Sequence, residues 1–355
     1  MSETLRGMLP GIYHPFLPAF FDTLAPEEKK ATCSNCAMCP PPGASAVEGV
    51  VYFRPEAKCC TYHPRLPNYL VGAVLGDPSE EMAEGRLRIR AQIQGRIGVS
   101  PRWLAPSRRY SLLLKASRDS SFGRALSLRC PYFQEQGGLC TIWRYRESDC
   151  STFFCKHEGG ADGKIFWSAL DGYLRLVENR LSAFAIEGLS PTLGEPASPN
   201  GQLSLEELEG LPPAKSDYQH YWRGWEGREE ELYLAAHARV SALRPGDLES
   251  IVGVSPPDLA EVEGAYRRLT APVLPERLVL NPDASLTPVP DGMLAVTFSR
   301  YEPVLLSPDL HEVLKELRAD ETVVDFQARL LRDHAIAIPD AMLLGLHQLR
   351  VVISA

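Results

Sequence analysis

The distribution of cysteine constrains this chain more than any other feature of its sequence. All nine cysteines precede residue 156, and the last 200 residues contain none. Incidental buried cysteines would not gather in one half of a chain. Because the cytosol keeps thiols reduced, structural disulfides are a poor explanation, and metal ligation is the leading interpretation.

The N-terminal segment predicts a cytoplasmic protein. It lacks the basic start and the continuous apolar core of a secretory signal. The longest apolar run, residues 69–75, is far shorter than the roughly 20 residues that a membrane-spanning helix requires. We therefore expect no membrane partner.

The first cysteine group begins with Cys33, Cys36 and Cys39, each separated from the next by two residues. This spacing lets one tight loop direct three thiolates at a single metal or cluster, and a remote cysteine then completes the set. Cys59 or Cys60 is the nearest candidate. Because zinc more often uses paired C-x2-C units, an iron–sulfur cluster, preferably 4Fe-4S, is the first expectation and zinc is the alternative.

The second group has nine, nine and four residues between its members, which are Cys130, Cys140, Cys150 and Cys155. These four make a further complete tetrahedral set. One thiol is then spare, and Cys59 and Cys60 compete because adjacent residues seldom both bind one ion. Convergence of all nine thiols on one larger site stays open.

Two histidines, His63 and His157, follow Cys60 and Cys155 closely. Imidazole can replace thiolate at iron or zinc, but a place beside the ligands is the more common one. A catalytic cysteine with His157 as its general base is the less favoured alternative, because one nucleophile would leave the other eight clustered thiols unexplained. No catalytic or cofactor-binding residue is assigned, and whether the chain is an enzyme is left open.

The order of these motifs resembles the YkgJ-type cysteine-cluster family, described as a zinc- or iron-chelating domain. The match covers about residues 30–160: C-x2-C-x2-C, a Cys-Cys pair, Cys-Pro-Tyr, Gly-Leu-Cys-Thr-Ile-Trp and Phe-x-Cys. The family places its Cys-Cys pair directly after the second gap, whereas nineteen residues intervene here. That departure leaves open which of Cys39, Cys59 and Cys60 are ligands.

Flagellin lysine N-methylases have a similar cysteine arrangement and are thought to use an iron–sulfur cluster with S-adenosylmethionine. Their activity is not transferred to this chain. The C-x3-C-x2-C signature of radical enzymes is absent, and no G-x-G-x-x-G marks a methyl-donor pocket.

Positive charge is concentrated between Arg86 and Arg129, which contain eleven Arg or Lys against one acid in a chain of net charge −8. Such a field can attract a small anion or an acidic partner. The favoured interpretation is compensation, in which the arginines neutralise thiolates or pair with acids elsewhere in the chain. Nucleic acid binding is the least favoured interpretation.

The sequence predicts an α+β protein of two domains. An irregular cysteine-cluster domain spans residues 1–272, with ligand loops at 33–60 and 130–155 and helices over 164–185 and 218–243. After the boundary at Pro272–Pro275, residues 273–355 form a small winged-helix-like domain. There, three β-like runs precede three short helices with Ser307, Thr322 and Asp340 as N-caps.

Residues 277–353 also resemble a PqqD-type winged helix that binds peptides. The resemblance implies a peptide or protein substrate, with the strand near residues 293–298 accepting it by strand addition; a structural or dimerising role is the alternative. We expect an iron–sulfur protein that acts in redox chemistry or in protein or peptide modification. The alternatives are a zinc-stapled binding protein with an arginine-rich anion or partner site, and a protein of metal storage or delivery.

Overall fold

The computed structural model describes residues 3–29, 33, 36–40, 43, 50–189 and 202–355. The chain forms two compact units, each built from three segments. The first unit comprises Met1–Ala25, Phe53–Phe153 and Leu170–Ala260, and the second comprises Pro26–Tyr52, Phe154–Ala169 and Glu261–Ala355. Helices and small antiparallel sheets occur together, which confirms the α+β class. The predicted boundary near residue 272 stays a prediction.

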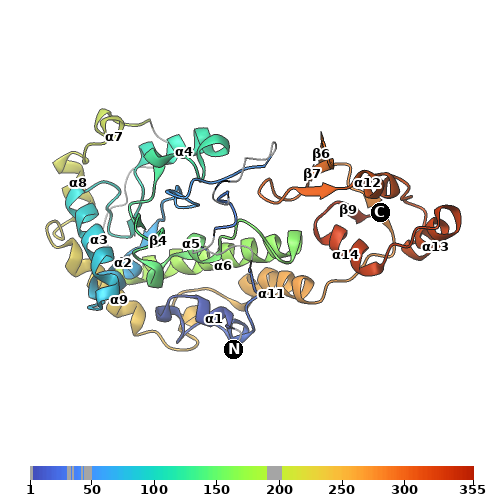
Figure 1. Ribbon diagram of the computed structural model, residues 1–355. Coiled ribbons are helices and arrows are strands. Elements are labelled where there is room, and N and C mark those ends of the chain that lie inside the picture. The colour runs from blue at the N-terminus through green and yellow to red at the C-terminus, as the bar shows by residue number, and fades with distance from the viewer. Residues whose placement is uncertain (1–2, 30–32, 34–35, 41–42, 44–49, 190–201) are drawn as a thin grey trace. The chain divides into compact units, whose positions relative to one another are not determined.

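The first unit is mainly helical (Figure 1). Two helices, α6 and α11, also contribute residues to the second unit. The helices of the first unit are α1 (Leu5–Met8), α2 (Asn68–Gly76), α3 (Ala83–Gly95), α4 (Arg108–Ser121), α5 (Ser148–Thr152), α6 (Gly160–Glu187), α7 (Leu205–Glu209), α8 (Lys215–Trp222), α9 (Glu229–Ser241), α10 (Asp247–Ser250) and α11 (Pro256–Thr270). The predicted helix over 164–185 lies inside α6. Among the described helices, none has the length and apolar content to cross a membrane.

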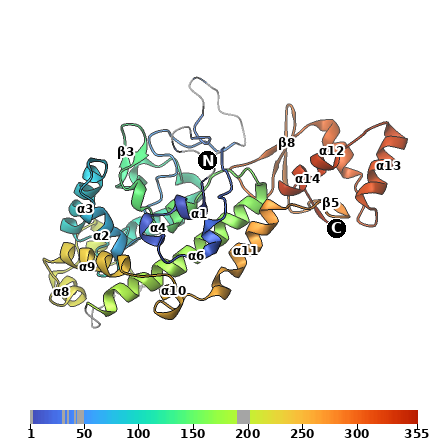
Figure 2. The ribbon, with the colours of Figure 1, turned by 90° about the horizontal axis from the view of Figure 1, so that it is seen from below.

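The core of the first unit lies between α2, α3, α8 and α9. Figures 1 and 2 both show α2 beside α9, and α2 is buried along nearly its whole length. Trp222 and Tyr233 fill this core with no exposed surface, so Trp222 is a core residue. Cys130 belongs to the same buried cluster, and Cys60 and Cys140 pack against it. The core therefore supports three of the cysteines directly.

The helix predicted over 218–243 is wrong as one continuous element. The structure has α8 up to Trp222 and a new start of α9 at Glu229. Between them, Gly224 and Gly227 have φ angles of 91° and 79°. Glycine adopts this left-handed region without steric cost, so the two glycines turn the chain where the apolar pattern alone predicted a helix.

Two short antiparallel strand pairs complete the first unit. β1 (Leu66–Pro67) pairs antiparallel with β2 (Trp103–Leu104), and β3 (Phe133–Gln134) pairs with β4 (Leu139–Cys140). In the second pair Phe133 is directly opposite Cys140. These pairings fix the backbone on both sides of the cysteine-bearing loops.

The second unit contains two antiparallel sheets and three helices of its own (Figure 1). The strands are β5 (Leu278–Leu280), β6 (Ser285–Val289), β7 (Gly292–Val296), β8 (Val304–Leu306) and β9 (Val352–Ser354), paired as β5-β9 and β6-β7-β8. The helices are α12 (Pro308–Lys315), α13 (Val323–His334) and α14 (Asp340–Gln348). Their core contains Leu314, Phe326 and Leu343, each at most 1% exposed.

Two of the three predicted N-caps of this unit are confirmed. Ser307 Oγ accepts a hydrogen bond from Leu310 N–H at 3.2 Å, and Thr322 Oγ1 accepts one from Asp325 N–H at 3.1 Å. Asp340 is instead the first helical residue of α14, and Pro339 occupies the cap position. An acidic residue is favourable both at the N-cap and in the first turn of a helix. The sequence alone therefore could not tell which of these two positions Asp340 occupies.

The strand expected to accept a peptide is not at an edge. β7 pairs with β6 on one side and with β8 on the other, so its backbone groups are already used in the sheet. Strand addition at β7 is therefore wrong; the edges of this sheet are β6 and β8.

Candidate metal centre

The first unit brings together five of the nine predicted ligands: Cys59, Cys60, Cys130, Cys140 and Cys150. Cys130 is buried and the other four are partly exposed. The remaining four, Cys33, Cys36, Cys39 and Cys155, belong to the second unit. The expectation that Cys59 or Cys60 completes the set of Cys33, Cys36 and Cys39 stays a prediction.

A backbone hydrogen bond joins the two cysteine groups of the first unit. The N–H of Cys130 donates to the C=O of Cys60 at 2.7 Å. His63 supports this junction, because its Nε2 lies 3.1 Å from the Leu128 carbonyl oxygen and 3.0 Å from that of Arg129. Carbonyl oxygens only accept, so Nε2 carries the proton and cannot bind a metal. His63 thus holds the ligand loop as a neighbour of the cysteines.

The loop containing Cys59 and the β3–β4 hairpin are also tied together. Lys58 Nζ donates to the carbonyl oxygen of Gly138 at 2.9 Å, in the turn that precedes Cys140. After the hairpin, Thr141 is buried, and both its N–H and its Oγ1 donate to the carbonyl oxygen of Tyr132, at 2.9 and 3.0 Å. These contacts hold Cys140 and Cys59 on neighbouring segments.

Cys150 lies in the short helix α5, which Glu147 caps. The Glu147 carboxylate accepts hydrogen bonds from Asp149 N–H at 2.6 Å and from Cys150 N–H at 3.1 Å. A carboxylate at this position satisfies two of the unpaired N–H groups at the helix start and favours the positive end of its dipole. The orientation of Cys150 therefore depends on Glu147.

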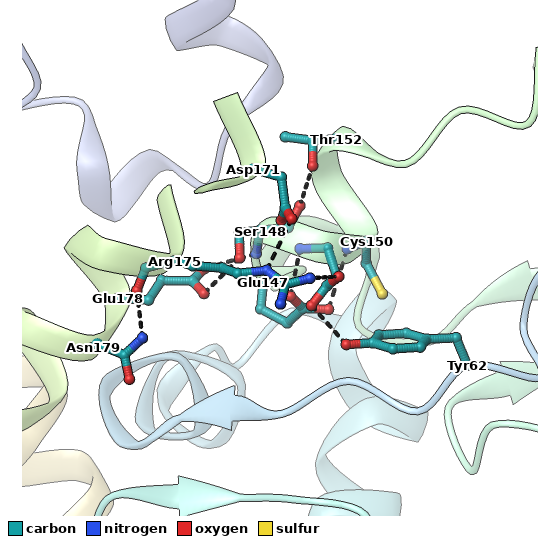
Figure 3. A network of polar contacts seen from close by, with 10 residues as sticks. Tyr62, Glu147, Ser148, Cys150, Thr152, Asp171, Arg175, Glu178 and Asn179 are labelled. Atoms are coloured by element: carbon teal, nitrogen blue, oxygen red, sulfur yellow. Dashed lines mark hydrogen bonds and ion pairs between the residues drawn. The ribbon is translucent and has the colours of Figure 1, made fainter. Parts of the chain in front are cut away.

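A buried polar network attaches α5 to α6 (Figure 3). Glu178 of α6 accepts hydrogen bonds from Ser148 N–H at 2.8 Å and from Ser148 Oγ at 2.9 Å. Tyr13 donates to Glu178 at 3.1 Å, and its hydroxyl lies 2.9 Å from that of Tyr69. Both oxygens of this buried carboxyl are thus hydrogen-bonded, as burial requires.

Charged groups at the edge of the same network are paired. Arg175 contacts Asp149 and forms an ion pair with Asp171 at 2.9 Å. Tyr62, two residues after Cys60, donates to Asp149 at 2.6 Å. The loop with Cys59 and Cys60 and the helix with Cys150 therefore share one anchoring network.

The thiols of the first unit influence one another electrostatically. Burial, opposed by a backbone hydrogen bond from Tyr132, raises the pKa of Cys130, and the charges of Cys140 and Cys59 add to the rise. Burial raises the pKa of Cys150, with further contributions from Glu147, Cys130 and Cys140. Without a cation these thiols stay protonated at neutral pH. Metal binding would convert them to thiolates and release protons.

Cys59 and Cys60 differ in their surroundings. The hydrogen bond with the Cys60 thiol, followed by burial, raises the pKa of Cys59. Cys59 is also the member of the pair whose charge acts on Cys130. Cys60 packs against the hydrophobic core of the first unit. Cys59 is therefore the preferred ligand candidate of the pair because of its electrostatic contact with Cys130, since Cys130 and Cys140 contact the same core as Cys60.

The cysteine thiols of the first unit have the donor chemistry of a thiolate-bound metal, but their side chains do not converge on a common position. Within the part of the chain that the structure describes, no three His, Cys, Asp or Glu side chains are arranged to hold a metal ion. Thiolates around a tetrahedral zinc ion lie about 3.8 Å apart, given Zn–S bonds of about 2.3 Å. Loading would therefore require the cysteine side chains to turn toward one another.

Most arginines of the basic stretch have acceptors within the first unit. Arg88, Arg90 and Arg108 form ion pairs with Glu84, Glu230 and Glu207 at 2.7, 3.1 and 2.9 Å. Arg88 also donates to the carbonyl oxygens of Pro131 and Phe133, both at 2.7 Å, beside Cys130. These contacts favour the interpretation that the stretch compensates acids of the same chain and braces the ligand loop.

Sequence inspection missed Glu147 and Glu178. Glu178 left a signal, because it lies between Leu174 and Leu181 on the apolar stripe of α6, where a carboxyl requires partners. The sequence signal for Glu147 is weaker, because glutamate is not a preferred N-cap residue and its place before α5 does not predict a capping role.

The pH dependence of stability should report on Glu147. Burial, followed by the charge of Asp149, raises its pKa to about 7. A raised carboxyl pKa favours the folded state in the protonated form, so this contribution is present below the unfolded pKa of about 4.3 and is lost as pH rises toward 7. In metal-free protein, the free energy of unfolding of a Glu147→Gln variant should fall less over this range than that of the wild type. The difference should be on the order of 2 kcal/mol.

Urea unfolding followed by circular dichroism between these pH values measures the difference. Asp283→Asn, at an exposed position of the second unit, is the matched neutralisation and should leave the wild-type profile unchanged. Parallel profiles for wild type and Glu147→Gln would show that Glu147 titrates normally.

Comparison with known proteins gives no further constraint. No protein-family model matches the sequence, and no curated protein and no solved structure matches it. The resemblances to YkgJ-type and PqqD-type proteins therefore stay predictions.

Proposed function

We propose that the first unit holds an iron–sulfur cluster, of the 4Fe-4S type, through Cys59, Cys130, Cys140 and Cys150. The observation that carries the proposal is the set of hydrogen bonds that tie the cysteine-bearing segments together: Cys130 N–H to the Cys60 carbonyl oxygen, Lys58 Nζ to the Gly138 carbonyl oxygen, and the Tyr62 hydroxyl to Asp149. Four soft thiolate donors suit iron–sulfur clusters and zinc better than they suit magnesium or calcium. Zinc in the same ligand set is the alternative.

The proposed centre acts in redox chemistry or in the modification of a protein or peptide in the cytoplasm. The buried network of Glu147, Ser148 and Glu178 supports such a role, because second-layer hydrogen bonds hold ligand segments and tune a bound metal. The second unit would supply recognition as a winged-helix-like, PqqD-like module. A peptide would add to the β6 or β8 edge of its sheet.

The test is anaerobic purification followed by visible absorption and by analysis of iron, acid-labile sulfide and zinc. Brown protein with stoichiometric iron and sulfide is the expected result. Colourless protein with stoichiometric zinc would replace the cluster by a structural zinc site. Protein without bound metal, even after reconstitution with iron and sulfide, would overturn the proposal.

A further inference from the structure

Helix α13 of the second unit has apolar side chains on two of its faces. One face is buried in the core of the unit and contains Val323, Phe326 and Leu330. On another face, Val324 is 72% exposed and Leu331 is 59% exposed. Figures 1 and 2 show α13 at the periphery of the second unit. A helix that packs against a single core requires only one apolar face, so the second face is suited to a further contact.

The exposed apolar positions follow the spacing of one helix face. Val324, Ala328 and Leu331 are four and three residues apart, so they form a stripe along α13. Ala328 is exposed at the centre of this stripe. The distance between two packed helices depends on the side chains at their contact, and a small central residue lets the backbones approach closely. The stripe is therefore shaped to pack against a second helix.

Two residues of opposite charge flank the stripe. Asp325 and Arg332 are both exposed and seven residues apart, which is nearly two helical turns, so they lie on the same side of α13 about 10.5 Å apart along its axis. Each has a local contact: Thr322 Oγ1 donates to Asp325 at 2.7 Å, and Arg332 pairs with Asp333 at 2.9 Å. Such exposed contacts contribute little free energy. They would therefore compete only weakly with pairing to another chain.

A second copy of this chain has the surface that the stripe and its charges fit. In an antiparallel pair of α13 helices with a two-fold axis beside Ala328, Val324 of one copy faces Leu331 of the other. Asp325 of one copy faces Arg332 of the other, and the symmetry repeats both contacts. A parallel pair would place like charges together, which disfavours that orientation. The order of residues along α13 is thus complementary to its own reverse.

We propose that the second unit mediates homodimerisation through an antiparallel α13–α13 contact centred on Ala328. This surface is separate from the cysteines of the proposed metal centre, and the inference does not depend on that centre. Because α13 has 12 residues, it is about 18 Å long, and the contact is smaller than a standard protein interface. The dimer is therefore reversible, with a dissociation constant on the order of micromolar.

The experiment uses two variants of the full-length protein that each place like charges across the contact. Arg332→Glu opposes Asp325 of the second copy, and Asp325→Lys opposes Arg332. Sedimentation velocity over a concentration series, with a reductant present to prevent disulfides between chains, should show a dimer for the wild type. Each variant alone should have a dissociation constant raised on the order of tenfold or more, because two exposed ion pairs become two repulsive contacts. An equimolar mixture of the two variants should regain the dimer, because opposite charges then face each other again.

A third variant guards against a fold defect, because both charge reversals oppose the helix dipole. Ala328→Glu keeps a residue of high helix propensity at an exposed position and places two carboxylates together at the two-fold axis. It should weaken the dimer while circular dichroism stays that of the wild type. Arg277→Glu, at an exposed position before β5, is the matched charge reversal and should dimerise like the wild type.

Three results would overturn the inference. A wild type that stays monomeric throughout the concentration series would leave the exposed face of α13 to a partner of another kind. Variants that dimerise as tightly as the wild type would place the contact on another surface. A mixture of folded Arg332→Glu and Asp325→Lys that stays monomeric would exclude the antiparallel pairing of Asp325 with Arg332.

Discussion

A Cys59→Ser variant should lose the metal of the first unit, whereas Cys60→Ser should retain it. The charge of the Cys59 thiol contributes to the raised pKa of Cys130, which places Cys59 beside another proposed ligand. Loss of a direct ligand should weaken binding more than the roughly 100-fold that loss of a supporting group can cause. Iron and sulfide per chain, measured after a chelator wash, give the comparison.

Circular dichroism of both metal-free variants provides the control, because serine is close in size to cysteine and should preserve the fold. Cys60→Ser replaces the thiol that hydrogen-bonds to Cys59 by a hydroxyl, so a small change in affinity is compatible with the assignment. The reverse pattern, with metal lost only in Cys60→Ser, would make Cys60 the ligand. Retention of metal by both variants would remove the pair from the ligand set.

The helices could be predicted from sequence where the apolar period and the polar caps agree. The segment 164–185 has that period throughout, and the hydroxyls of Ser307 and Thr322 cap the helices that carry the apolar stripes of α12 and α13. Prediction failed where one glycine pair redirected the chain between α8 and α9. The strand β6 was also missed, because it contains Pro288. Proline is tolerated in a sheet mainly at an edge strand, and whether a strand lies at an edge depends on the tertiary fold.

The contact that joins the cysteine segments of the first unit could not be predicted from sequence, and the grouping of the thiols into ligand sets stays a prediction. Spacing along the chain placed Cys59 and Cys60 with Cys33, Cys36 and Cys39, whereas the hydrogen bond between Cys60 and Cys130 joins segments about seventy residues apart. Such a long-range contact depends on loop closure and packing, which leave no local signal. The supporting carboxyls were missed for the same reason, since Glu178 acquires its role only when Ser148 and Tyr13 pack against it.

Gly72→Ala should destabilise the first unit by about 3 kcal/mol, the upper end of the usual cost of overpacking a core, because the overlap is with backbone and not with a flexible side chain. Gly72 lies where α2 crosses α9. A Cβ atom there would lie 2.0 Å from the carbonyl oxygen of Tyr233 and 2.8 Å from the Cβ of His237. The nearest atom belongs to a helix backbone, so relief requires α9 to move away from α2 as a whole. That movement would also open the core around Trp222.

Gly172→Ala is the matched control, because Gly172 lies within α6 and a Cβ atom there meets nothing within 4 Å. Alanine at that position should raise the free energy of unfolding by about 0.4–1 kcal/mol, because it reduces the conformational entropy of the unfolded chain. Chemical denaturation of metal-free protein measures both variants. Equal stabilities for Gly72→Ala and wild type would mean that the two helices do not pack as closely in solution. If the free energy of unfolding falls in Gly72→Ala and rises in Gly172→Ala, the loss arises from the α2–α9 contact, because the helix propensity of alanine favours both substitutions equally.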